Sequence, residues 1–298
     1  MPPLPSLPMI SYRDLQAKKP AALLALAQTM HEIGFFYLLD HPVPLEKEIA
    51  LLNVSKDFFA LPLVEKEKIS IYHSQHFRGF SNLGSEQTQG IPDHKEIIDF
   101  GRECNSIPLI KPYHTMVGPN QWPLQPAALQ QVVLSYMDIM LSIGATLMES
   151  IALSMGWPKT FFQEQFKGQP FSLMRVIYYP HQEANPEKKI GVGEHTDFGC
   201  LVLLLQDDTG GLEVQLSSGS WVEAPPIPRT LVVNIGDMLA LWSGAYLKAT
   251  PHRVINKSNK DRYSFPFFYE PAIDTVVQQR CYGEHIYEAF RRSFPDHG

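Results

Sequence analysis

Cysteine is scarce in this chain of 298 residues, which has only Cys104, Cys200 and Cys281 and no CxxC pair. Three widely spaced cysteines in a chain of this size argue against a disulfide framework and against a zinc finger. Long basic runs are also missing, since no Lys/Arg run exceeds two residues and the net charge is −6. The sequence offers nothing that would attract a phosphate backbone, so we expect no nucleic-acid partner.

Signals for export or membrane insertion are equally weak. The first twelve residues, MPPLPSLPMISY, lack the basic start and the apolar run of a signal peptide. The apolar stretch 132–157 is interrupted by Asp138, Gly144 and Glu149, whereas a spanning helix needs about 20 largely uncharged residues. We therefore expect a buried helix there, and a cytoplasmic protein that is a monomer or a weak homo-oligomer and has no membrane partner.

Several common catalytic motifs are absent from the sequence. It contains no GxxxxGK[ST] loop, no GxGxxG that opens a helix, no GxSxG elbow and no HExxH helix. The composition, with 44% hydrophobic and 19% charged residues, is that of a folded globular core. A small molecule is therefore the partner that the composition favours.

The two halves of the chain differ in their expected secondary structure. Hydrophobic periodicity predicts helices at 20–33, 44–63 and 123–155, a strand at 35–41 and a loop at 75–93. From Phe171 onward short β-type runs alternate with turn residues, and a last helix is expected at 283–294. The expected strands are FSLMRVIYYP, CLVLLLQD, GLEVQL, SWVEAPP, TLVVNI, MLALWS, HRVINK and RYSFPFFYEP. Many short strands at near-regular spacing predict a sandwich, a barrel or a jelly roll.

The stretch GVGEHTDFGCLVLLLQ carries a pair of candidate metal ligands, His195 and Asp197. Residues two apart on a strand point to the same side, so this imidazole and this carboxylate are expected to face one interior. His252 in TPHRV follows 55 residues after Asp197 and is the candidate third ligand. Two histidines and one carboxylate with open positions suit a non-haem Fe(II) oxygenase.

An anion-binding pair follows the third candidate ligand. Arg262 and Ser264 lie two apart, and Arg262 comes ten residues after His252. The guanidinium fork binds a carboxylate through paired hydrogen bonds, and a serine hydroxyl can add one more. An arginine that points into an apolar interior needs an anionic partner. A dicarboxylate that chelates the metal at one end and reaches Arg262 at the other would supply it; an acidic residue of the protein is the alternative.

These motifs resemble the isopenicillin N synthase-like branch of the 2-oxoglutarate/Fe(II)-dependent dioxygenases. The resemblance rests on RVIYYP, GEHTDFG, QDDTGGLEV, NIGDML, TPHRV and RYSFPFFYEP, and in the first half on GFFYLLDHPVP, RGF and PDHKEIIDFG. It implies a mainly β fold, a double-stranded β-helix (jelly roll, cupin-like) with supporting N-terminal helices and a C-terminal helix. We expect one domain, with mostly helical support at 1–165, the jelly-roll core at 166–273 and the last helix at 274–298.

The resemblance also implies roles for the candidate residues. His195, Asp197 and His252 would hold Fe(II), and Arg262 with Ser264 would bind the far carboxylate of 2-oxoglutarate. The family often has Asn where this chain has Ile177, so a polar contact near the co-substrate is missing. Tyr179 can still donate its phenol, and Arg175 on the same strand face could reach the metal-proximal carboxylate.

Candidate substrate contacts are less well determined by the sequence. Phe268 lies four residues after Ser264 and should share its inward direction, which makes it an apolar wall. Phe80 and Phe198 are further candidates, each with a core role as the alternative. Glu96 belongs to a segment that lines the pocket in the resembled family, with a structural carboxylate as its alternative. Arg253 follows His252 and should face away, into an ion pair.

The expected activity is oxidation, most simply hydroxylation, of a small organic molecule by O2, with conversion of 2-oxoglutarate to succinate and CO2. Two alternatives stay open at this stage. One is a non-haem iron oxidase of the same fold that works without 2-oxoglutarate, because isopenicillin N synthase uses its Arg and Ser to grip substrate. The other is a non-catalytic binding protein on the same scaffold, against which the complete ligand set argues.

Overall fold

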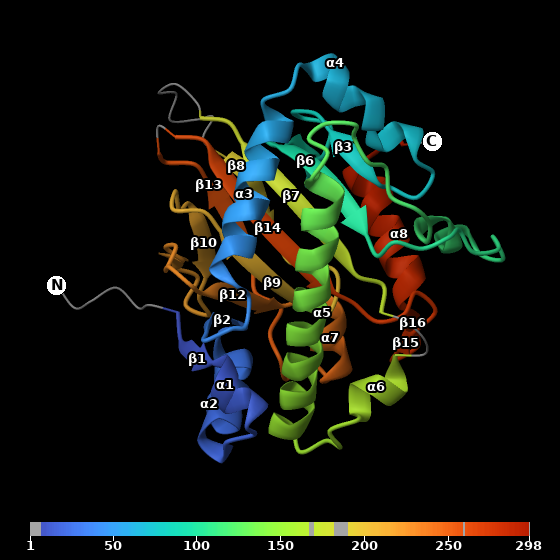
Figure 1. Cartoon of the computed structure of the whole chain (residues 1–298). Coiled ribbons are helices and arrows are strands. Elements are labelled where there is room, and N and C mark those ends of the chain that lie inside the picture. Colours follow the sequence, from blue (N-terminus) through green and yellow to red (C-terminus); the bar gives the residue numbers. More distant parts are fainter. Residues whose placement is uncertain (1–6, 167–169, 182–189, 259, 298) are drawn as a thin grey trace.

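A computed structural model describes residues 7–166, 170–181, 190–258 and 260–297. Two sheets form its centre (Figure 1). The larger sheet contains β1 (Met9–Ser11), β2 (Phe35–Leu39), β3 (Gly79–Ser81), β6 (Glu96–Gly101), β7 (Leu173–Tyr179), β9 (Leu201–Gln206), β12 (Leu231–Ile235) and β14 (Arg262–Tyr269). The smaller sheet contains β8 (Ile190–His195), β10 (Leu212–Gln215), β11 (Trp221–Glu223) and β13 (His252–Ile255). Short pairs are β4 (Gln87–Thr88) with β5 (Ile91–Pro92), and β15 (Val276–Val277) with β16 (Arg280–Cys281).

The strand order mixes the two halves of the chain. In space the larger sheet runs β1-β2-β12-β9-β14-β7-β6-β3, and the smaller runs β11-β10-β13-β8. Strands of the first hundred residues thus pair with β12 at one end of the larger sheet and with β7 towards the other. The expected jelly-roll core is confirmed, and strands that precede residue 166 extend its larger sheet at both edges.

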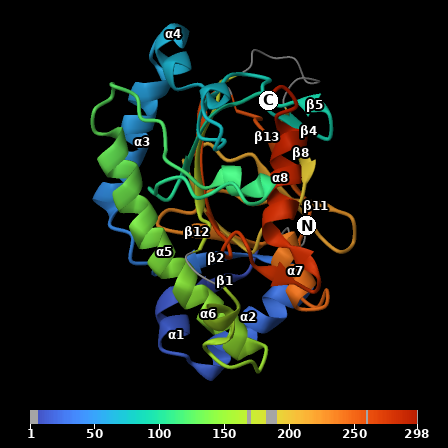
Figure 2. The same cartoon turned by 90° about the vertical axis from the view of Figure 1, so that its right-hand side faces the viewer.

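Helices cover this core from two sides. They are α1 (Tyr12–Gln16), α2 (Pro20–Glu32), α3 (Leu45–Phe59), α4 (Leu63–Lys66), α5 (Leu129–Ser154), α6 (Phe161–Gln165), α7 (Asp237–Trp242) and α8 (Tyr282–Ser293). Short 3-10 helices are η1 (Glu67–Ile69), η2 (Ile71–His73) and η3 (Pro112–Met116). Figure 2 shows α3 and α5 on one side of the strands and α8 on the other. The three long helices of the first half and the last helix are confirmed, with ends shifted by a few residues.

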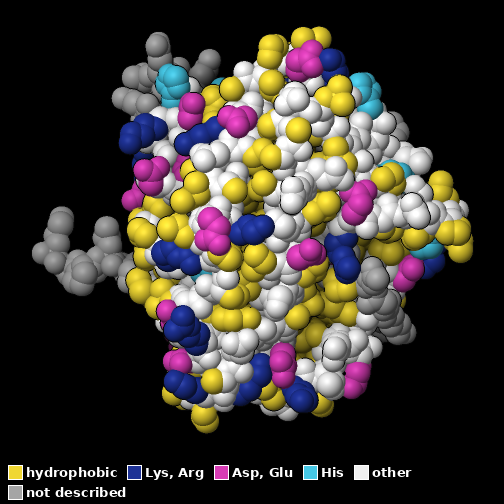
Figure 3. Space-filling view, viewed as in Figure 1, with side chains coloured by type: hydrophobic (Ala, Val, Ile, Leu, Met, Phe, Trp, Pro, Cys, Tyr) yellow, Lys and Arg dark blue, Asp and Glu magenta, His cyan; other side chains and the backbone are white. Residues whose placement is uncertain are grey.

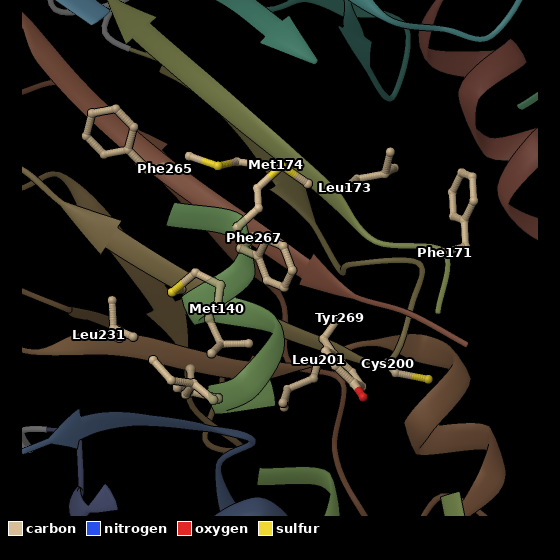
Figure 4. Packing of buried hydrophobic residues seen from close by; sticks show 14 of the residues in the cluster. Met140, Phe171, Leu173, Met174, Cys200, Leu201, Leu231, Phe265, Phe267 and Tyr269 are labelled. Carbon is tan, nitrogen blue, oxygen red and sulfur yellow. The ribbon is translucent and has the colours of Figure 1, made fainter. Parts of the chain in front are cut away.

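The alternation of side chains along β9 explains how the larger sheet is packed. Leu201, Leu203 and Leu205 belong to the main hydrophobic cluster with the residues of α5, while Val202 and Leu204 line a cavity on the opposite face. Both faces are therefore buried, which is why CLVLLL (200–205) is apolar without interruption. Figure 4 shows Met140 of α5 among Phe267, Leu201 and Leu231 on the helix side of the sheet.

Helix α5 is the long apolar stretch of the sequence. Its length and composition alone would allow it to cross a membrane, but it packs against α2, α3 and the strands β9 and β14. Gly144 faces the sheet, and a Cβ atom at this position would meet the ring of Tyr269. The helix can approach the sheet this closely because residue 144 has no side chain.

Two of the expected local structures are wrong. MLALWS forms no strand, because residues 237–242 are the helix α7; a short apolar run does not by itself distinguish a strand from a buried helix. The expected loop 75–93 contains β3 and the β4–β5 hairpin. The hairpin turn places Gln89 at φ 52° and Gly90 at φ 78°, as a two-residue turn between antiparallel strands requires.

Charged side chains are scattered over the face shown in Figure 3, with Lys/Arg and Asp/Glu groups interspersed among apolar ones. This matches the modest share of charged residues in the composition. On this face the side chains of one sign do not gather over any one element.

Candidate active site

His195, Asp197 and His252 come together at one end of the smaller sheet. Their candidate ligand atoms all lie within 4.8 Å of one another, and His195 pairs with His252 across β8 and β13. Asp197 does not extend the strand as the sequence analysis assumed, because β8 ends at His195 and Asp197 lies in the turn that follows. The turn, rather than strand alternation, brings the carboxylate to the two imidazoles.

Both imidazoles are held in the orientation that a metal ligand needs. Nδ1 of His195 lies 2.8 Å from the carbonyl oxygen of Gly193, and Nδ1 of His252 lies 3.1 Å from that of Thr250. Since a carbonyl only accepts, each Nδ1 donates and each Nε2 keeps its lone pair. Burial and then the neighbouring His252 lower the pKa of His195 to about 4. Its imidazole is therefore neutral at neutral pH and ready to bind a cation.

Arg262 lies on β14 in the same cavity, and among the described residues it forms no salt bridge with an acidic side chain, although the charge of Asp207 is near enough to be felt. Its Nε donates to the carbonyl oxygen of Gly210 at 2.6 Å and its Nη2 to Oε1 of Gln206 at 3.3 Å. Its Nη1 is buried and has no hydrogen-bond partner. A buried guanidinium with a free donor needs an anion. The alternative raised by the sequence, an ion pair between Arg262 and an acidic residue of the protein, is not found among the described residues.

The cavity between the two sheets has a volume of about 580 Å³ and includes the three candidate ligands together with Arg262. Ser264, Tyr179, Ile177 and Arg175 also line it, as the same strand faces predict. Of the expected substrate contacts, Phe198 and Phe268 belong to its wall. Residues of the β4–β5 hairpin and of α8 also line the cavity, among them Thr88, Gln89 and Phe290.

Arg175 has protein partners that the sequence analysis did not foresee. Its Nε and Nη2 donate to the two oxygens of Asp99 at 2.7 and 3.1 Å, and its Nη1 lies 2.7 Å from Oε1 of Glu86. Lys95 lies 2.6 Å from the other oxygen of Glu86 and 2.8 Å from Asp93. We call Glu86, Asp93, Lys95, Asp99 and Arg175 the clamp, because it joins the base of the β4–β5 hairpin to β6 and β7. A contact of Arg175 with the co-substrate stays a prediction.

Two expected substrate contacts lie elsewhere. Glu96 is buried but faces away from the cavity, where its Oε2 is 2.6 Å from Nζ of Lys66. Alternation along β6 explains this, since Lys95 and Glu96 must face opposite sides. Phe80 is only 1% exposed and packs against Phe58 in the main core. Arg253 does face away from the ligands, and its Nη2 lies 2.8 Å from Glu213.

Three residues that contact the site residues were not among the sequence predictions. Gln206 and the carbonyl group of Gly210 hold Arg262. The side-chain amide of Asn234 donates to Oδ2 of Asp197 at 2.6 Å. Asn234 stands in the motif NIGDML, and Gln206 and Gly210 in QDDTGGLEV, so the motifs were visible but the roles of these residues were not.

Two family models match the chain. The 2OG-Fe(II) oxygenase superfamily matches residues 170–271, and the N-terminal region of the non-haem dioxygenases in morphine synthesis matches residues 7–125. Homoarginine-6-hydroxylase 2-ODD-C23 of Glycine max is 36% identical over 326 residues and covers 98% of each chain. This chain belongs to the 2-oxoglutarate/Fe(II)-dependent oxygenases. A 1-aminocyclopropane-1-carboxylate oxidase of Dictyostelium discoideum is 33% identical to this oxygenase, over 92% of this chain and 83% of the relative.

Solved structures share the fold of this oxygenase over nearly its whole length. A full-length Neurospora crassa protein in complex with α-KG and thymine has a TM-score of 0.81 and 26% identity, covering 95% of this chain and 97% of that one. JOX2 in complex with 2OG, Fe and JA has a TM-score of 0.80 and 27% identity, covering 98% and 86%. The protein is thus an oxidoreductase that uses Fe(II), 2-oxoglutarate and O2, as the motifs predicted.

Proposed function

We propose that His195, Asp197 and His252 hold the Fe(II) ion of this oxygenase, and that Arg262 binds the far carboxylate of 2-oxoglutarate. The buried Nη1 of Arg262, which has no partner in the described chain, carries this assignment because it lies in the same cavity as the three ligands. Ser264 and Tyr179 line the cavity beside it, and both offer a hydroxyl group to the same carboxylate.

The donor set fits the metal. Two neutral imidazoles and one carboxylate, with further positions free, are the ligands that non-haem Fe(II) oxygenases use. A bound Fe(II) ion would supply the activation of O2, coupled to the oxidative decarboxylation of 2-oxoglutarate to succinate and CO2. The chain supplies orientation and a cavity whose walls are largely apolar, with Phe35, Val192, Val202 and Leu204 among the lining residues. Such walls exclude water and strengthen the contacts of Arg262.

We infer that the substrate is a small organic molecule that is hydroxylated between the ligands, the β4–β5 hairpin and α8. Phe198 and Phe268 supply apolar contact, while Glu86, Lys95 and Arg175 bring charges of both signs to the wall. A molecule with both signs of charge suits such a lining. Since relatives at 36% identity are named homoarginine-6-hydroxylases, L-homoarginine is the first substrate to test. We further propose that the enzyme acts in the cytoplasm as a monomer or weak homo-oligomer, without nucleic-acid or membrane partners.

Anaerobic titration of the Fe(II)-loaded protein with 2-oxoglutarate tests the site assignment. We expect a metal-to-ligand charge-transfer band in the wild-type protein and none in His252→Ala. A wild-type protein that binds Fe(II) without developing the band would contradict the proposal. Succinate release with L-homoarginine, measured together with a gain of one oxygen atom by mass spectrometry, tests the substrate separately. If only uncoupled succinate appears, homoarginine is wrong while the metal and co-substrate assignments stand.

A further inference from the structure

Among the described residues, the side chain of each of the three ligand residues makes one hydrogen bond, and one of these bonds differs in kind. His195 and His252 are held by the main-chain carbonyl groups of Gly193 and Thr250. Asp197 is held by a side chain, the amide of Asn234, at 2.6 Å. A main-chain carbonyl is present whatever the residue type, whereas the hydrogen bond to Asp197 exists only because residue 234 is Asn. A substitution of Asn234 therefore removes the support of a ligand directly.

Asn234 is the fourth of the five residues of β12, and the other four are apolar. Its neighbours Val233 and Ile235 belong to the main hydrophobic core, whereas Asn234 is 3% exposed and lines the cavity. A buried amide is costly unless it is hydrogen-bonded. Because an ionised carboxylate only accepts hydrogen bonds, the nitrogen of the amide must face Asp197. The contact therefore satisfies the amide and fixes the carboxylate at once.

The residues that follow Asn234 hold the main chain of the turn that carries Asp197. The N–H groups of Gly236, Asp237 and Met238 donate to the carbonyl oxygens of Cys200, Asp197 and Gly199, at 3.0, 2.8 and 2.9 Å respectively. A Cβ atom at position 236 would collide with the carbonyl group of Gly199, so glycine is required for this approach. With the main chain fixed in this way, the freedom left to Asp197 is the rotation of its side chain.

We propose that Asn234 is a positioning residue that sets the rotation of the Asp197 carboxylate before metal arrives. The proposal rests on the assignment of His195, Asp197 and His252 as the metal ligands. Without the amide, the carboxylate would have to be ordered at the moment of binding, and the entropy lost then would weaken the affinity. Loss of such a supporting contact commonly weakens metal affinity about 10- to 100-fold.

The test is the affinity for Mn(II), measured by electron paramagnetic resonance of free Mn(II) in the full-length protein. Asn234→Leu keeps the approximate volume but removes the donor, and Asn234→Ala removes both. We expect both variants to bind Mn(II) about 10- to 100-fold more weakly than the wild type. Wild-type Mn(II) affinity in Asn234→Leu would overturn the proposal. If Asn234→Ala alone then bound Mn(II) more weakly, the lost packing rather than the lost hydrogen bond would be the cause.

Two further variants separate this proposal from the assignments on which it depends. Gln206→Leu removes an amide that contacts Arg262 and not the ligands, so its Mn(II) affinity should stay unchanged. His252→Ala should abolish Mn(II) binding; if it does not, the ligand assignment fails rather than the role of Asn234. If Asn234→Leu does not fold, Asn234→Ser, whose hydroxyl group is too short for the same contact, takes its place. The Mn(II)-dependent rise in Tm gives a second readout, because ligand binding stabilises in proportion to the logarithm of [L]/Kd.

Discussion

The guanidinium carbon of Arg262 lies 4.8 Å from the centre of the Tyr179 ring. The pairing follows from the register, because Arg262 on β14 is directly opposite Tyr179 on β7. The ring supports the positive charge without neutralising it, so the charge stays available for an anion. The Arg262 guanidinium thus contacts an aromatic ring and two carbonyl oxygens, while its Nη1 has no partner in the described part of the chain. This arrangement allows it to bind a carboxylate from outside the protein.

Arg262→Lys is expected to weaken 2-oxoglutarate binding by at least about 30-fold. Lysine keeps the charge but loses the planar fork and the ring contact, and breaking a buried charge-assisted pair costs about 2 kcal/mol or more. The charge-transfer band of the Fe(II) protein gives the Kd. Arg253→Lys is the matched control, because Arg253 also lies over an aromatic ring, that of Trp221, but outside the cavity. Equal losses in the two variants would contradict the assignment.

Glu86→Gln is expected to destabilise the protein by about 3–5 kcal/mol, because it removes the carboxylate that the largely buried Arg175 shares with buried Lys95. Urea unfolding at neutral pH measures this change. Glu65→Gln is the control, since Glu65 and Lys68 form an exposed pair, and it should cost no more than about 1 kcal/mol. A similar small effect in both variants would show that the clamp contributes little.

The stabilising effect of Glu86 should also depend on pH. Burial raises the pKa of Glu86, but Arg175 and Lys95 outweigh it and lower this pKa from the ordinary 4.5 to about 2. A carboxylate whose pKa is lower in the folded state contributes stability above its unfolded pKa and loses it as the pH falls. The difference in unfolding free energy between wild type and Glu86→Gln should therefore be constant above about pH 5 and shrink between about pH 4.5 and 2. A difference that does not change across this window would be inconsistent with the lowered pKa.

Gly144→Ala tests the close approach of α5 to the sheet. In an exposed helix this change would stabilise by about 1 kcal/mol, but here the new methyl group would meet the ring of Tyr269. We expect a net destabilisation of about 1–3 kcal/mol from overpacking, seen as a lower urea midpoint. Ser142→Ala, at an exposed position of the same helix, should change stability by less than about 0.5 kcal/mol. A stabilised Gly144→Ala would mean that helix and sheet can separate at no cost.

The polar motifs predicted most of the site because the order HxD, then His, then RxS is specific, although each motif alone is common. HxD, the later His252 and the RxS pair identified the residues that the structure brings into one cavity. The prediction of Glu96 went wrong because the face of β6 depends on a register that the sequence does not show. The clamp was missed because Glu86 and Arg175, 89 positions apart, meet only when the hairpin folds over β7. MLALWS was predicted to be a strand because a run of five apolar residues fits a strand or a buried helix.

The interleaving of early and late strands limits how this protein can be dissected. A fragment confined to residues 166–273 would keep both ligand histidines but lose β2 beside β12 and β6 beside β7. It would present the bare backbone edges of β12 and β7 to water, and such edges recruit other chains into aggregates. Expression trials should therefore keep the amino-terminal hundred residues, even where only the catalytic half is wanted.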